Sequence, residues 1–120
     1  MVVLKGAPTV IAAPDGRVAV NPTGNPGMAT MGMGDVLTGV IAGFVAQGLS
    51  PYDAACAAVF VHGLAADVAH ASVGTLSLVA GDVTATLPQV LSRLANIGPD
   101  GTRSSARALP PDRIAPDPPE

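Results

Sequence analysis

The stretch "NPTGNPGMATMGMGDVLTG", residues 21–39, is rich in glycine and holds a single carboxylate, that of Asp35. Glycine adopts backbone conformations that other residues rarely reach, and glycines just before a helix leave amide hydrogens free to face an anion. The overlapping run "DVLTGVIAGFVAQG" predicts a helix with Asp35 near its N-cap and Gly48 at its C-terminal stop. The stretch therefore predicts an anion site at the start of a helix.

The residues before this stretch predict β-strands. Val and Ile dominate "VVLK" (residues 2–5) and "TVIAAPDGRVAV" (residues 9–20), and the Pro-Asp-Gly sequence at 14–16 is typical of a tight turn. Strand residues at the very beginning leave no room for an earlier helix. We therefore expect an α/β fold whose chain opens in the middle of a sheet and whose fold is incomplete.

Two further helices are predicted after residue 48. Ser50 can cap the first, which begins at "SPYD" and is expected to run to about His70. "AGDVTATLPQVLSRLA" predicts the second, with Asp82 at or near its cap and Pro88 disturbing it. The folded domain is expected to span residues 1–95, and the proline-rich residues 96–120 to form a disordered tail.

A stripe of small residues is predicted on the helix that follows Asp35. Gly39, Ala42, Gly43 and Ala46 recur at the helical spacing of three and four residues. Glycine inside a helix costs about 1 kcal/mol relative to alanine. We therefore expect a neighbouring element to pack very closely against this stripe.

Composition excludes several classes of function. The net charge of −3 lacks the basic excess that would follow a nucleic-acid backbone or an anionic membrane. Cys56 is the single cysteine, so no intrachain disulfide can form, and a reducing, cytoplasmic setting fits best. The apolar runs at 36–46 and 54–66 are shorter than the roughly 20 residues of a membrane span. A cytoplasmic protein that binds neither nucleic acid nor membrane is expected.

The carboxylates narrow the search for a reactive group. Residues 1–95 contain five aspartates and no glutamate. Structural roles account for four of them: Asp15 in a turn, Asp53 and Asp82 at helix caps, and Asp67 in a weak surface pair with His70. Asp35 is either a plain N-cap or a group that accepts a proton beside the anion site. The adjoining "GMGD" favours the second interpretation.

Other templates fit poorly. The glycine stretch lacks the GK[ST] ending of a Walker A loop and the third glycine of a dinucleotide fingerprint. His62 and His70 lie roughly 80° apart around a helix, so they do not form a metal site, and each is interpreted as a packed or exposed helix residue. No metal ligands are assigned from the sequence.

The combination of "KGAPTVIA" with "NPTGNPGMATMGMGDVLTG" resembles the ADP-dependent NAD(P)H-hydrate dehydratases. The likeness continues through "VHGLAADVA" and "LVAGDVTATLPQVL", so that it covers about residues 2–92. The resemblance implies the C-terminal portion of a ribokinase-like three-layer α/β/α fold with a mainly parallel sheet. It also implies an activity: removal of water from (S)-NADH or (S)-NADPH hydrate, with ADP converted to AMP and phosphate.

The same resemblance implies roles for individual residues. The residues that would line the adenine-nucleotide site are Lys5, Gly6, Ala7, Pro8, Thr9 and Gly34. The amides of Gly32, Met33 and Gly34 would form the anion hole. Asp35 would contact the hydrated coenzyme and act as the base that activates its hydroxyl group. Lys5 could alternatively be a surface lysine at the end of a strand.

The ligands and partners follow from the resemblance as well. Hydrated NADH or NADPH and an adenine nucleotide would bind, and Mg²⁺ is expected with the phosphoryl chemistry. Family members run to more than twice this length, so an N-terminal half, an epimerase domain or a second copy could be a protein partner. Two other hypotheses remain: another ribokinase-like small-molecule kinase, and a non-catalytic remnant or interaction module.

Overall fold

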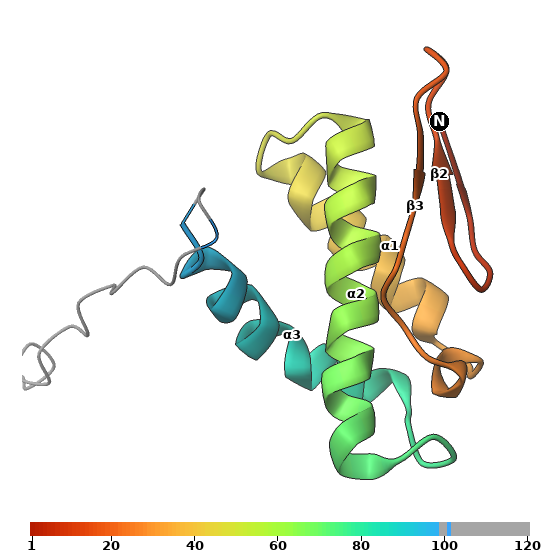
Figure 1. Cartoon of the computed structure of the whole chain (residues 1–120), viewed down its shortest axis with the longest axis vertical. Helices are drawn as coiled ribbons and strands as arrows, with labels where there is room; N and C mark the ends of the chain where they lie inside the picture. Colours follow the sequence, from red (N-terminus) through yellow and green to blue (C-terminus); the bar gives the residue numbers. More distant parts are fainter. Residues whose placement is uncertain (99–100, 102–120) are drawn as a thin grey trace, which may run out of the picture.

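The computed structural model describes residues 1–98 and 101. Three short strands form one sheet, and three helices pack together beside it (Figure 1). The elements in chain order are β1 (Val2–Leu4), β2 (Val10–Ala12), β3 (Val18–Val20), the 3₁₀ helix η1 (Pro26–Met28), α1 (Met33–Ala46), α2 (Pro51–Val73) and α3 (Ala80–Ala95). The predicted α/β class is confirmed.

The sheet has the order β1-β2-β3, and both pairings are antiparallel. Consecutive strands joined by short connections can only pair this way, because a parallel pair needs a crossover of a dozen or more residues. The mainly parallel, three-layer sheet that we expected is therefore not found among the described residues. They contain an antiparallel sheet with helices packed on one face.

The two faces of the sheet differ in burial. The register places Val3, Ile11 and Ala19 side by side, and these residues face α1 and α2. Ile11 at the centre is only 1% exposed. The alternate residues of the two edge strands point to the opposite face and are 60–65% exposed: Val2, Leu4, Val18 and Val20. Both faces are apolar, but only one is covered by the described chain.

Helix α2 lies at the centre of the molecule, between α1 and α3 (Figure 1). Five of its alanines are completely buried: Ala54, Ala55, Ala58, Ala65 and Ala66. Such small side chains let neighbouring elements approach the helix closely. By length and composition alone, α2 could cross a membrane, which the shorter apolar runs of the sequence did not predict. Its buried side chains pack within the two hydrophobic clusters of the molecule, as in the core helix of a globular domain.

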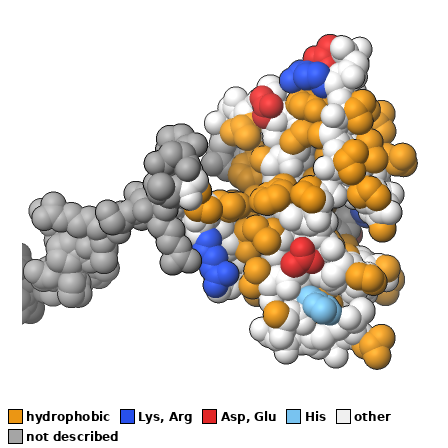
Figure 2. Space-filling model, viewed as in Figure 1, with side chains coloured by type: hydrophobic (Ala, Val, Ile, Leu, Met, Phe, Trp, Pro, Cys, Tyr) orange, Lys and Arg blue, Asp and Glu red, His pale blue; other side chains and the backbone are white. Residues whose placement is uncertain are grey.

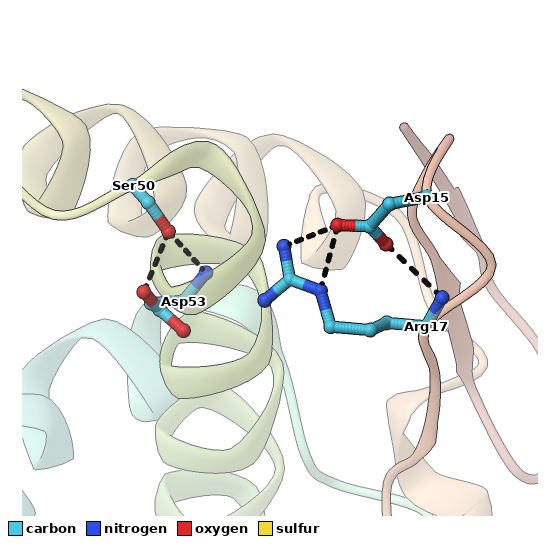
Figure 3. Close-up of polar contacts among 4 residues, drawn as sticks. All are labelled: Asp15, Arg17, Ser50 and Asp53. Carbon is cyan, nitrogen blue, oxygen red and sulfur yellow. Dashed lines mark hydrogen bonds and ion pairs between the residues drawn. The ribbon is translucent and has the colours of Figure 1, made fainter.

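The helix limits follow local signals in the sequence. Gly48, with a φ of +96°, lies two residues beyond the end of α1. The Ser50 hydroxyl caps α2, because it accepts a hydrogen bond from the Asp53 amide at 3.2 Å and donates one to the Asp53 carboxylate at 2.6 Å (Figure 3). Both predicted positions are confirmed, and α2 continues slightly past His70 to Val73.

The turn between β2 and β3 is closed by an ion pair. The Asp15 carboxylate accepts hydrogen bonds from the Arg17 amide and from Arg17 Nε, at 3.1 and 2.9 Å (Figure 3). These bonds lower the pKa of Asp15 and raise that of Arg17. The Arg17 guanidinium also lies 4.2 Å from the centroid of the Tyr52 ring. The predicted turn is thus confirmed, and Arg17 connects it to the start of α2.

Helix α1 agrees with one part of its prediction and differs from another. Asp35, expected near the N-cap, is the third residue of the helix, and the cap itself is Gly32, with a left-handed φ of +84°. The small-residue stripe is exposed, and nothing in the described part of the chain lies within 4 Å of a Cβ built at Gly39 or Gly43. The close packing that we expected on this face is therefore not supplied by the described residues.

Helix α3 begins where Asp82 predicts it. The Asp82 carboxylate accepts a hydrogen bond from the Val79 amide at 2.9 Å, so that it caps the helix from inside the first turn. Pro88 lies within the helix, which nevertheless continues to Ala95. The tail predicted for residues 96–120 lies, apart from 96–98 and 101, outside the described residues.

Candidate functional site

A cleft of about 950 Å³ lies where four segments of the chain meet. The loop of residues 5–9 forms one wall, and the irregular segment 21–31 forms another. Met33 and Leu37 come from the beginning of α1, while Val59, His62 and Gly63 come from the middle of α2. The predicted nucleotide-binding loop and most of the glycine-rich stretch therefore face one common space.

Hydrogen bonds of the Thr9 side chain stabilise the conformation of loop 5–9. The Thr9 hydroxyl accepts a hydrogen bond from the Gly6 amide at 3.4 Å and donates one to the Gly6 carbonyl at 3.3 Å. The Thr9 carbonyl accepts a hydrogen bond from the Asn21 amide at 2.9 Å, which joins the loop to the segment after β3. All five residues of the predicted nucleotide loop line the cleft.

Lys5 connects this loop to the start of α1. A Cβ atom built at Gly34 would lie only 2.6 Å from Lys5 Nζ, so the ammonium group lies directly against the Gly34 backbone. Lys5 and Gly34 are 29 positions apart in the sequence, yet they meet at this contact. A cation thus lies over the first turn of a helix, where the positive end of the helix dipole also favours an anion.

The predicted anion-hole residues form the cap and first turn of α1. The Val36 amide donates to the Gly32 carbonyl at 3.0 Å, which closes the first turn and leaves the earlier amides without acceptors inside the helix. Met33 is 3% exposed and lines the cleft, whereas Gly32, Gly34 and Asp35 are not among its lining residues. Asp35 is exposed, and its carboxylate accepts no hydrogen bond within the described part of the chain.

His62 is a lining residue that the sequence did not identify as functional. It is 4% exposed, and its Nε2 atom has no hydrogen-bond partner among the described residues. Burial lowers the pKa of His62, with a smaller opposing contribution from the Met33 backbone, so the neutral imidazole is favoured. A buried, unpaired ring nitrogen beside a cleft is costly and is not explained by packing alone.

The interpretation of Asp67 as a partner of His70 is wrong. The Asp67 carboxylate instead accepts hydrogen bonds from the Gly24 amide at 2.9 Å and from the Asn25 side-chain amide at 2.8 Å. His70 Nε2 pairs with the Thr75 hydroxyl at 2.7 Å. No signal in the sequence joins "NPTGN" to "HGLAAD", two segments about 40 residues apart.

Residues 1–89 match the family model described as NAD(P)H-hydrate dehydratase. This match covers all three strands and the first two helices, and it extends into α3.

Individual relatives agree with the family model. The chain is 55% identical over 94 residues to the bifunctional NAD(P)H-hydrate repair enzyme Nnr of Moorella thermoacetica, which covers 78% of the chain and 18% of that protein. It is 49% identical over 83 residues to the ADP-dependent (S)-NAD(P)H-hydrate dehydratase of Neisseria meningitidis, covering 68% of the chain and 28% of that protein.

Solved structures also resemble the chain. The ADP/ATP-dependent NAD(P)H-hydrate dehydratase from Bacillus subtilis, co-crystallized with ATP/Mg²⁺, superposes with a TM-score of 0.73 at 42% identity. The superposition covers 76% of the chain and 33% of that structure. The chain therefore spans about a fifth to a third of the length of these relatives.

Proposed function

The chain belongs to the NAD(P)H-hydrate dehydratase family, and on that premise we propose that it serves ADP-dependent dehydration of (S)-NAD(P)H hydrate. The products are NADH or NADPH, AMP and phosphate. Because the chain spans only part of its relatives, we propose that it forms the C-terminal portion of a ribokinase-like α/β/α fold, with residues 1–95 as the folded unit. The remaining strands and the second helical layer come from another polypeptide segment.

The contact between Lys5 and Gly34 carries the proposal. Phosphoryl transfer needs a cation and hydrogen-bond donors held together around the phosphate groups. Lys5 supplies the cation, and the first-turn amides of residues 32–34 supply donors that are not used inside the helix. The adenine nucleotide lies along loop 5–9, whose residues line the cleft. The cation and the amide donors are both needed for phosphoryl transfer from ADP, and they lie next to each other at the start of α1.

Asp35 has the position of a general base in this proposal. Its carboxylate is exposed, is free of partners in the described residues and lies one residue after Gly34. Asp35 accepts the proton of the hydrate hydroxyl group as that oxygen attacks the β-phosphorus of ADP and AMP leaves. Phosphate then leaves the coenzyme ring with its C–O bond pair, and loss of a neighbouring proton forms the double bond.

Mg²⁺ would accompany the nucleotide rather than a metal cage of the protein. The described residues contain no group of three or more His, Cys, Asp or Glu side chains that could hold a metal ion. Magnesium commonly binds through substrate phosphates and only one or two carboxylates, and Asp35 is the carboxylate nearest in sequence to the proposed anion site. The ion would neutralise charge on the transferred phosphoryl group.

The uncovered surfaces of the chain indicate its protein partner. The outer face of the sheet is apolar and exposed, and so is the small-residue stripe of α1. Figure 2 shows hydrophobic side chains over much of the visible face. An N-terminal portion of the same fold would cover such surfaces, and an epimerase domain is a further candidate partner. Homo-oligomerisation is an alternative way to cover them. The single free Cys56 agrees with a cytoplasmic setting.

Recovery of absorbance at 340 nm from hydrated NADPH, with ADP and Mg²⁺ present, tests the proposed activity. The chain is assayed alone and with the N-terminal portion of a relative. We expect turnover only in the mixture, and Asp35→Asn in that mixture should lower it at least 100-fold while AMP binding is retained. Unchanged turnover in Asp35→Asn would remove Asp35 from the mechanism. Binding without any turnover would favour a non-catalytic remnant.

The small-molecule kinase is separated from this function by its products. A kinase would consume ATP and leave a stable phosphorylated alcohol, whereas the dehydratase releases inorganic phosphate and restores the reduced coenzyme. The family match over residues 1–89 favours the dehydratase. Phosphate release measured together with 340 nm absorbance distinguishes the two reactions.

A further inference from the structure

One wall of the cleft has no regular secondary structure except for η1. Segment 21–31 follows β3 and leads to α1, and most of its residues line the cleft. An irregular segment can hold a defined shape only when its polar groups are paired. The contacts of residues 21–27 with α2 therefore decide how this wall is positioned.

The first contact of this wall is made by Thr23. Its hydroxyl donates to the Phe60 carbonyl of α2 at 2.9 Å and lies 3.1 Å from the side-chain oxygen of Asn21. The Asn21 side-chain amide donates to the Thr23 carbonyl at 2.9 Å. Gly63 allows the approach, because a Cβ atom there would lie 2.8 Å from the Thr23 carbonyl carbon. The segment is thus held against the backbone of α2.

The second contact is made by Asp67, one turn further along α2. Its two oxygens separately accept hydrogen bonds from the Gly24 amide and the Asn25 side chain, at 2.9 and 2.8 Å. The other end of the Asn25 side chain accepts a hydrogen bond from the Gly27 amide at 3.0 Å, which caps η1. One carboxylate therefore orients Asn25, and Asn25 in turn orients the residues that follow in the wall.

We propose that Asp67 is a positioning residue that fixes the segment 24–28 as a wall of the ligand cleft. This inference rests on the proposed function, because the ligands it concerns are those of the dehydration reaction. Asp67 is half-buried and is not a lining residue, so it acts through Gly24 and Asn25 rather than on the substrate. Its charge strengthens both hydrogen bonds relative to a neutral acceptor.

A reciprocal exchange of side chains tests this proposal. In Asp67→Asn, the new amide group must face either Gly24 N–H or Asn25 Nδ2, so one of the two hydrogen bonds is lost. In the double variant Asn25→Asp/Asp67→Asn, the amide of residue 67 can donate to the new carboxylate, and its oxygen can still accept from Gly24. The second oxygen of residue 25 remains available to the Gly27 amide. Asp53→Asn, at the beginning of the same helix, is the matched control.

Dissociation constants for ADP and for hydrated NADPH are measured with each variant by calorimetry, on chains that circular dichroism shows to be folded. We expect Asp67→Asn to weaken at least one ligand by tenfold or more, the double variant to recover most of the loss, and the control to bind like the unchanged chain. Unchanged affinity for both ligands in Asp67→Asn, or no recovery in the double variant, would overturn the proposal.

Amide hydrogen exchange separates this proposal from the proposed function. Exchange at Gly24 should accelerate at least tenfold in Asp67→Asn and return toward its original rate in the double variant. If the unchanged chain binds neither ligand, the proposed function fails for this chain, and the positioning role is judged from Gly24 alone. An exchange rate at Gly24 that Asp67→Asn leaves unchanged would then show that Asp67 does not hold the wall.

Discussion

The two faces of the sheet have nearly the same composition and opposite environments. On the inner face, Ile11 lies between Val3 and Ala19 and packs against α1 and α2. On the outer face, side chains such as Leu4 and Val20 are at least 60% exposed. Hydrophobic residues do not by themselves locate the core of this chain. The described residues cover only the inner face, so the apolar outer face is free to pack against another surface.

The largest effect should come from truncation on the inner face. Ile11→Ala should lower the free energy of unfolding by about 2–5 kcal/mol, because it removes buried methyl groups and leaves a cavity. Leu4→Ala, on the outer face, should change it by less than about 0.5 kcal/mol. Urea unfolding followed by circular dichroism measures both. Equal losses would mean that the outer face is buried in solution and that the comparison fails.

An intermediate effect is expected from His62, on the packed side of the molecule. Burial lowers its pKa below the ordinary value of 6.5, so the unfolded chain takes up a proton first as the pH falls. The free energy of unfolding should therefore be constant above about pH 7.5 and fall as the pH drops below about 6.5, by on the order of 1 kcal/mol per unit of pKa lowering.

The pH dependence of variants checks this assignment. His62→Leu should remove most of the decrease below about pH 6.5, whereas His70→Gln should retain it. Urea titrations at several pH values provide the measurement. If the decrease persists in His62→Leu, another group is responsible and the packed side does not hold a buried neutral imidazole.

The smallest effect should come from Arg17, at the rim of the inner face. The two side chains of its ion pair with Asp15 are more than half exposed, and its guanidinium also contacts the half-buried Tyr52 ring. Arg17→Ala should destabilise the chain less than Ile11→Ala, and added salt should reduce the difference from the unchanged chain. Arg17→Lys keeps the charge and serves as the control. A loss that is independent of salt would indicate packing rather than charge.

The sequence predicted features that depend on neighbouring residues. The turn at residues 14–16, the cap at Ser50 and the stop at Gly48 each rely on groups within a few positions, and the structure confirms them. The family resemblance also implied that residues 5–9 belong to a common site, and these residues line the cleft. The roles assigned to them and to Asp35 stay predictions.

Features that depend on distant residues were not predicted. Asp67 was assigned to His70, three positions away, because its real partners lie 42 and 43 positions earlier in the chain. The small-residue stripe of α1 was expected to be covered, but helical spacing shows only that a face is suited to close packing. Asp35 was expected near the N-cap and is the third residue of α1, but the alternative that Asp35 is itself the N-cap is wrong, because the left-handed Gly32 has that role.

The anchoring of segment 21–25 to α2 has a consequence for the order of folding. Each strand pairs with the next strand in the chain, and such local contacts form at little cost in loop entropy. The hydrogen bonds from Thr23 to Phe60 and from Gly24 and Asn25 to Asp67 join residues 37–43 positions apart. They can form only after α1 has turned back onto α2. We therefore expect the hairpins and helices to appear first during refolding, and the ligand cleft to acquire its shape in the last step.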